Sequence, residues 1–343
     1  MRVCCWDSAE LECRGEAPHR GRLNRSVMLY NFSLLDLALS ALTAVSLPLY
    51  AFLLWVLVRE RTNPKLRSSF FLLSTLLGGA DVLATLIRYS MHLAPFWGLG
   101  VQALFLPNAV WLAVVVSWLT LSLLTAQNLG VLLVALNRAT AVVAPSRYEL
   151  IWSRANAWKG VWATVAVSMW AAPVTAFYTK PVYTTADNVT AVIAFEKPVE
   201  MIVSLAGLIS GCCLLSALCY VVAIAHVIKH NWAKKQSGAV GSGDTTKGQA
   251  AAAELRLSVC GFTFFLTQAL LASAYVSFTF QLIDYATGYD IWLVAMDLFC
   301  YINPYSLLLM STEARRQFAK ALGCVPPPTA VVNMSRRVKT ITD

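Results

Sequence analysis

Hydrophobic residues gather in seven long stretches that are separated by short polar segments. Each stretch holds about twenty residues or more, the length an α-helix needs to cross a hydrocarbon core of about 30 Å. None shows the alternating pattern of about ten residues that is typical of a membrane-barrel strand. The pattern therefore predicts seven transmembrane helices, over residues 34–58, 68–92, 109–136, 158–178, 199–228, 257–280 and 290–311.

The composition is that of a chain that lies mostly in lipid. Of the 343 residues, 58% are hydrophobic and 13% are charged, whereas soluble domains carry about 25% charged residues. This balance excludes large soluble enzyme folds and long disordered chains. We expect an all-α membrane protein with an extracellular segment over residues 1–33, a seven-transmembrane helix bundle over 34–311, and a short amphipathic helix and tail over 312–343.

The basic residues predict the orientation of the bundle. Nineteen of the 27 Lys and Arg residues fall in the tail and the three loops on its side, and eight fall on the other side. Because cytoplasmic loops are enriched in Lys and Arg, the carboxyl terminus is expected in the cytoplasm and the amino terminus outside, in the plasma membrane. Glycosylation sequons at Asn24 and Asn188 lie on the predicted outer side. Residues 1–33 hold no long apolar run, so no cleavable signal peptide is expected.

Charged residues inside the predicted spans are the first candidates for function. Asp81 and Arg88 lie in the second span and Asp297 in the seventh. Each costs about 2.5–3.5 kcal/mol near a helix centre, so these side chains should face the bundle interior and have partners. Asp81 is then a functional-site candidate or a structural polar plug. Pro304 permits a kink in the seventh span, so Asn303 is predicted to turn its amide toward Asp81 and form a polar switch.

Short motifs resemble those of G-protein-coupled receptors. Residues 78–81 (GGAD), Asn137 with Arg138, and residues 303–305 (NPY) occupy the order and depth of the rhodopsin-like signature. The chain more closely resembles the nematode serpentine chemoreceptors of classes gamma and V. That resemblance covers roughly residues 40–320 and depends on the joint order of the passages at 47–50, 68–71, 127–138, 145–152 and 297–305.

The resemblance implies a receptor for a small odorant or pheromone-like molecule. It places the ligand in the outer half of the bundle and a heterotrimeric G protein at the cytoplasmic face, with Asn137 and Arg138 in the coupling. A cationic Arg88 would suit a ligand carboxylate. For the aromatic candidates the alternative role is packing or interface anchoring, which most aromatic residues in spans serve. The ligand-binding candidates are the polar and aromatic residues of the outer half: Arg88, Trp111, Tyr275, Gln281, Trp292 and Asp297.

Departures from the wider rhodopsin-like pattern restrict the ligand class. The seventh span has no lysine for a retinal Schiff base, and the third has no aspartate for an amine ligand. No cysteine occurs between residues 179 and 198, so the usual disulfide from the third span to the second outer loop is not expected. The four histidines lack metal-ligand spacing, and no nucleophile elbow or phosphate-binding glycine loop occurs. We therefore expect no enzyme, no cofactor, no metal and no nucleic-acid partner.

The segments on the predicted inner side have their own features. The Gly/Ser-rich residues 237–248 predict a flexible loop, followed by a helix over 249–256 that extends the sixth span. Residues 313–322 predict an interfacial helix on anionic lipid, with Cys324 just beyond as a palmitoylation site. A rival function is a membrane transporter or channel that uses Asp81, Arg88 and Asp297, although no internal repeat is evident. A purely structural membrane scaffold also remains open.

Overall fold

The structure is a computed structural model. It describes residues 34–324, apart from 61, 64–65, 67, 95–97, 106–107, 185–191, 196–197, 237–244, 281 and 284. Three residues singled out from the sequence lie outside the described residues, namely Asn24, Asn188 and Gln281.

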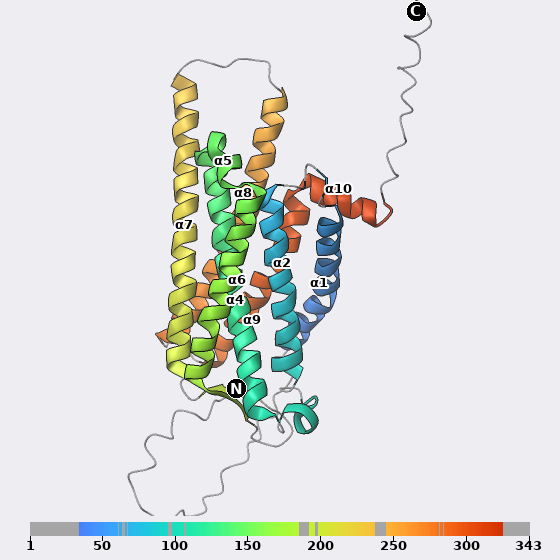
Figure 1. The fold of residues 1–343 in the computed structure, drawn as a ribbon, viewed down its shortest axis with the longest axis vertical. Helices are drawn as coiled ribbons and strands as arrows, with labels where there is room; N and C mark the ends of the chain where they lie inside the picture. The colour runs from blue at the N-terminus through green and yellow to red at the C-terminus, as the bar shows by residue number, and fades with distance from the viewer. Residues whose placement is uncertain are drawn as a thin grey trace, which may run out of the picture.

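Seven long helices stand side by side and form one bundle (Figure 1). Six of them are long and apolar enough to cross a membrane, judged over the described residues. The remaining helix, α6, packs along α4 and completes the bundle. The predicted seven-transmembrane fold is confirmed. The helices are α1 (Leu34–Arg59), α2 (Ser69–Ile87), α4 (Ala109–Val143), α6 (Arg154–Thr179), α7 (Pro198–Gln236), α8 (Thr245–Thr279) and α9 (Tyr285–Met310).

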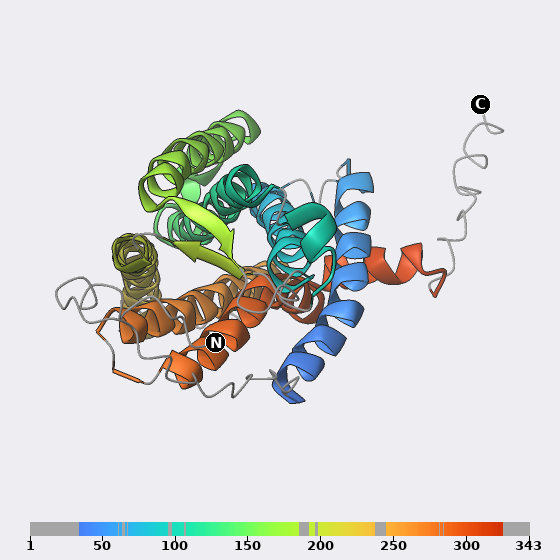
Figure 2. The ribbon, with the colours of Figure 1, turned by 90° about the horizontal axis from the view of Figure 1, so that it is seen from below.

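Short elements mark the two ends of the bundle. Helices α5 (Pro145–Ile151) and α10 (Thr312–Ala321) lie at one end, which we call the α10 end (Figure 1). Strands β1 (Pro181–Thr184) and β2 (Val192–Phe195) pair antiparallel at the opposite end, which we call the hairpin end. Figure 2 views the bundle from the hairpin end and shows the hairpin lying across it. There β1 packs on α4.

The observed helix ends differ from the predicted spans at several helices. The second span is not one helix to residue 92, because α2 ends at Ile87 and continues as a π-helix, η1 (Arg88–Leu93). A second π-helix, η2 (Val101–Phe105), follows. Helix α8 begins at Thr245, so the last four residues of the predicted 237–248 loop are helical. Helices α4 and α7 also run past the predicted ends at 136 and 228, because hydropathy marks only the lipid-embedded part of a helix.

The bundle is apolar on its outside as well as inside. Large side chains such as Leu53, Phe70 and Phe264 are fully buried between the helices. Other large apolar side chains point outward, including Trp170, which is 81% exposed, and Leu214 on α7. A soluble protein rarely exposes contiguous apolar surface of this extent. The outer surface is therefore suited to lipid, as expected for a multi-pass membrane protein.

Candidate ligand and coupling sites

A buried polar cluster surrounds Asp81 in the middle of α2. The Asp81 side chain is nearly inaccessible, and it accepts a hydrogen bond from the Tyr50 hydroxyl at 2.5 Å and from Gln127 Nε2 at 2.8 Å. Asn303 Nδ2 donates to the Tyr50 oxygen at 2.6 Å and to Asp81 Oδ2 at 3.5 Å. The predicted approach of Asn303 to Asp81 is confirmed. The cluster links α1, α2, α4 and α9 through hydrogen bonds to one carboxylate.

Gly78 allows α1 to approach this cluster. A Cβ atom at Gly78 would lie 2.7 Å from Leu54 Cδ2 and 2.8 Å from the Tyr50 hydroxyl oxygen. Both distances are shorter than real Cβ contacts show. The neighbouring Gly79 has open space at the same position. Glycine at 78 therefore lets Tyr50 reach Asp81. The apolar pattern of the first span gave no reason to expect that Tyr50 would contact this carboxylate.

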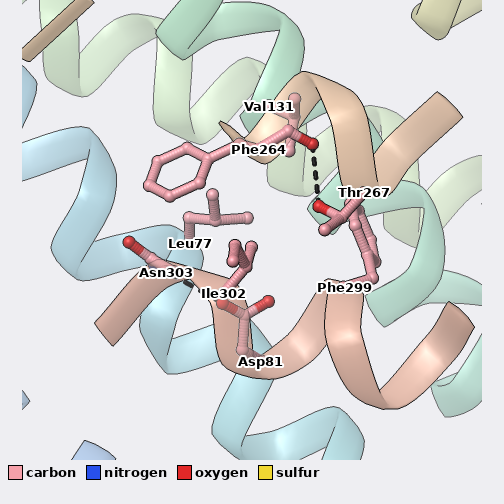
Figure 3. Close-up of a pocket in the computed structure, with 8 residues that line it drawn as sticks. All are labelled: Leu77, Asp81, Val131, Phe264, Thr267, Phe299, Ile302 and Asn303. Carbon is pink, nitrogen blue, oxygen red and sulfur yellow. Dashed lines mark hydrogen bonds between the residues drawn. The ribbon is translucent and has the colours of Figure 1, made fainter. Parts of the chain in front are cut away.

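A narrow void adjoins the Asp81 cluster between α2, α4, α8 and α9. In Figure 3, Asp81 and Asn303 lie on one side of this void and Phe264 lies across from them. The remaining lining residues are Leu77, Val131, Thr267, Phe299 and Ile302. Pro304 follows Asn303 directly in α9 and contributes no backbone N–H to that helix. The polar cluster thus adjoins a gap between helices that is too narrow to hold a water molecule, at the point where Pro304 removes a backbone hydrogen bond from α9.

Arg88 and Asp297 form a buried ion pair nearer the hairpin end. Arg88 Nη2 bonds Asp297 Oδ1, and the two residues are 9% and 1% exposed. The Arg88 guanidinium also lies 5.2 Å from the centre of the Tyr89 ring. The structure therefore brings together two of the predicted ligand residues, Arg88 at the start of η1 and Asp297 in α9. Arg88 is paired inside the bundle, as expected for a charged residue within a span.

Hydroxyl groups cluster beside this ion pair. Thr43 Oγ1 donates to the Tyr89 hydroxyl at 2.6 Å, and the Tyr301 hydroxyl donates to Thr43 Oγ1 at 2.8 Å. Tyr89 follows Arg88 in η1, and Tyr301 lies one helical turn after Asp297 in α9. Sequence analysis missed these three residues, because single Thr and Tyr residues in apolar spans carry no distinctive pattern.

The other predicted ligand residues lie in different surroundings. Tyr275 is buried on α8 and hydrogen-bonds with Trp292 of α9. Trp111 lies on the outside of α4, 58% exposed, and donates from Nε1 to Asn108 Oδ1 at 3.0 Å. The structure therefore does not place Trp111 in the interior where the sequence analysis expected it. Its position is typical of an aromatic residue at a membrane interface.

Tyr183 fastens the hairpin to the bundle. Its hydroxyl donates to the Met91 carbonyl of η1 at 2.6 Å, and its ring packs edge-on against Phe105 with 5.0 Å between ring centres. Burial raises the pKa of Tyr183 above its ordinary value of about 10, so the hydroxyl stays a donor. Leu112 and Val116 of α4 belong to the same apolar cluster. Among the described residues, apolar packing and the Tyr183 hydrogen bond hold the hairpin in a region whose sequence has no cysteine for a disulfide.

At the α10 end, Asn137 and Arg138 face the interior. Arg138 is 2% exposed, and its Nη2 donates to Asn137 Oδ1 at 2.7 Å and to the Tyr148 hydroxyl at 3.2 Å. Its guanidinium lies 4.5 Å from the centre of the Phe70 ring. Asn137 also donates to Ser69 Oγ at 2.9 Å. The predicted coupling pair is thus held by hydrogen bonds to Ser69 of α2 and to Tyr148 of α5. The sequence gave no reason to single out Tyr148 for this role.

Helix α8 closes over the same arginine. A Cβ atom at Gly261 would lie 2.6 Å from the Tyr220 hydroxyl oxygen and 3.4 Å from Arg138 Cγ. Glycine at this position therefore lets α8 pack directly on Arg138 and on Tyr220 of α7. The arrangement leaves the Arg138 guanidinium enclosed by neighbouring helices.

Helix α10 packs against α1 at this end. Phe318 meets Phe52 edge-on with 5.2 Å between ring centres, and Lys320 Nζ lies 4.0 Å from Glu60 Oε1. Leu322 is exposed just after the helix, as is Cys324. The predicted amphipathic helix is present as Thr312–Ala321. Palmitoylation of Cys324 stays a prediction.

Comparison with known proteins defines the class and then the family. The fold matches the crystal structure of squid rhodopsin with a TM-score of 0.65, over 86% of this chain and 87% of that one, at 14% sequence identity. The chain therefore has the rhodopsin-like seven-helix fold. The serpentine type 7TM GPCR chemoreceptor Srv family matches residues 39–324, and the protein belongs to this family. Of the two classes that the sequence resembled, the match is to class V. No curated protein sequence matches.

Proposed function

We propose that the protein is a chemosensory receptor that binds a small molecule in the half of the bundle nearer the hairpin end, the hairpin half, and activates a heterotrimeric G protein at its α10 end. In this proposal the hairpin end faces the outside of the cell and the α10 end faces the cytoplasm, across the plasma membrane. Membership of a receptor family also argues against an enzyme.

A polar path between the two halves carries the proposal. Cys300 lies one helical turn after Asp297 in α9, between the ion pair and Asn303. Gln127 Nε2 donates to Asp81 Oδ1 and also lies 3.4 Å from Cys300 Sγ. A ligand that disturbs the Arg88–Asp297 pair would therefore alter the surroundings of the Asp81 cluster.

The α10 end is closed in this structure, and signalling would require a second, open state. Arg138 is enclosed by α8 and held by Asn137 and Tyr148. A G protein that binds Arg138 must therefore favour an arrangement in which α8 has moved away. Ligand and G protein would both bias the same helix opening, which is the condition for coupling between two sites.

Cells that report second messengers test this function. A panel of small organic compounds is applied to cells that express the full chain, and we expect a response that Arg138→Ala abolishes while surface expression persists. Arg154→Ala, an exposed arginine at the start of α6, is the matched control and should keep the response. A full response from Arg138→Ala would remove the coupling role. Ligand-independent solute flux that depends on Asp81 would favour a transporter.

A further inference from the structure

The Arg88–Asp297 pair leaves hydrogen-bonding groups unused. Arg88 donates to Asp297 through Nη2, whereas its Nε and Nη1 have no hydrogen-bond partner among the described residues, and neither does Asp297 Oδ2. All three atoms are buried. Buried polar atoms in native structures almost always have a partner. Three such atoms around one ion pair mark a place where the polar group of a ligand gains hydrogen bonds.

The backbone at Arg88 is a second, independent indication. Helix α2 changes to the π-helix η1 at this residue, and π-helical turns occur frequently at functional sites. The far part of η1 is fixed by the hydrogen bond from Tyr183 to the Met91 carbonyl. The segment that presents Arg88 is therefore held by the hairpin on one side and by Asp297 of α9 on the other.

In the hairpin half most buried polar groups lie on one side, whereas the other side is mostly apolar, with Ser117 of α4 and Tyr275 of α8 as polar exceptions. The polar groups beside the ion pair come from α1, η1 and α9, and they are Thr43, Tyr89 and Tyr301. The buried residues of α4, α7 and α8 in this half include Leu112, Val116, Leu205, Ile209 and Leu271. A ligand with one polar group and an apolar chain matches this distribution, with its polar group at the ion pair.

The charge of the pair decides which polar group fits. Arg88 and Asp297 together are neutral and almost wholly buried. A ligand carboxylate that took over Arg88 would leave the Asp297 charge buried without a partner, and a ligand ammonium on Asp297 would do the same to Arg88. An unpaired buried charge is strongly unfavourable. An uncharged oxygen can accept from a free guanidinium N–H and leave the pair intact.

We propose that the Arg88–Asp297 pair is the polar anchor of the ligand site and selects uncharged oxygenated molecules, namely alcohols, ketones, aldehydes or esters. This inference rests on the proposed function and narrows its ligand class. It also replaces the ligand carboxylate expected from the sequence, because Asp297 already neutralises Arg88.

Thermal stability measurements with matched probes test the proposal. The full chain is purified into nanodiscs, and its melting temperature is measured with straight-chain probes from butyl to decyl that differ in the head group: alcohol, 2-ketone, carboxylate or ammonium. We expect the alcohols and ketones to stabilise the protein and to bind about tenfold or more tighter than the charged probes of equal length. Stronger or equal stabilisation by the carboxylates, or stabilisation by no probe, would overturn the proposal.

A charge-removing variant sharpens the test. In Asp297→Asn the Arg88 charge loses its partner, so we expect the preference to shift toward the carboxylates. Asp290→Asn, an exposed carboxylate on the same helix, is the control and should keep the wild-type order. An unchanged order in Asp297→Asn would contradict the proposal, and the wild-type comparison still decides if this variant does not fold.

The same measurement separates this inference from the receptor function. Melting temperature reports binding whether or not a G protein is present. Selective binding of uncharged probes without G-protein activation would support the site and remove the coupling. Activation by carboxylates would support the coupling and overturn the site.

Discussion

Replacing Gly78 by alanine tests how closely α1 must approach the polar cluster. The new methyl group would lie 2.8 Å from the Tyr50 hydroxyl oxygen and 2.7 Å from Leu54 Cδ2, so α1 or these side chains must move. Overpacking of this kind costs about 1–3 kcal/mol. Gly79→Ala is the matched control, because its Cβ meets no atom within 4 Å. Both variants gain about 0.8–1.0 kcal/mol in helix propensity, so their difference isolates the contact.

The assay is thermal unfolding of both variants in nanodiscs. At about 1–2 °C per kcal/mol for a chain of this length, Gly78→Ala should melt about 1–6 °C below Gly79→Ala. The displaced Tyr50 hydroxyl should also weaken the hydrogen bond to Asp81 and with it the response to ligand. Equal melting temperatures for the two variants would refute the close approach of α1 to α2.

Three further predictions follow from single contacts. Tyr183→Phe removes the hydrogen bond to the Met91 carbonyl, so the hairpin should lose about 0.5–1.5 kcal/mol of stability. Its backbone amides should then exchange faster with solvent, and unchanged exchange would show that packing alone holds the hairpin. Asp81→Ala leaves the buried Tyr50 hydroxyl without its acceptor and removes one acceptor each from Gln127 and Asn303. A buried group left unsatisfied costs about 1–3 kcal/mol, so the melting temperature should fall, and an unchanged value would contradict this. Trp111→Ala should leave ligand potency within about twofold in a dose–response assay, because this exposed side chain lies on the outside of α4, and a large loss of potency would place it in the site.

The number of helices was predictable because lipid imposes it. A chain in a bilayer must satisfy its backbone hydrogen bonds within each span, so every crossing appears as a long apolar stretch. The approach of Asn303 to Asp81 was predictable for a related reason, since the cost of a buried charge demands a partner. The extension of α8 was also predictable, because the Ala-rich residues 249–256 favour a helix that continues the sixth span. The end of α7 was not, because the polar residues 229–236 that extend it carry no hydropathy signal.

Contacts between distant segments were beyond the sequence. The π-helix at Arg88 lies between a hydrogen bond to β1 and an ion pair to α9, and neither partner is near in the chain. The role of Tyr50 was not evident from the sequence, because it depends on the close approach that Gly78 permits. Trp111 was misplaced because an aromatic residue in a uniformly apolar span does not show which face of the helix it occupies.

Nucleotide exchange is the most direct test of the central claim. Purified protein in nanodiscs is mixed with a purified heterotrimeric G protein, and exchange is followed with and without an activating compound. We expect the compound to accelerate exchange with the wild-type protein and to have no effect with Arg138→Ala. Solute flux through proteoliposomes with no acceleration of exchange by any compound would contradict the account.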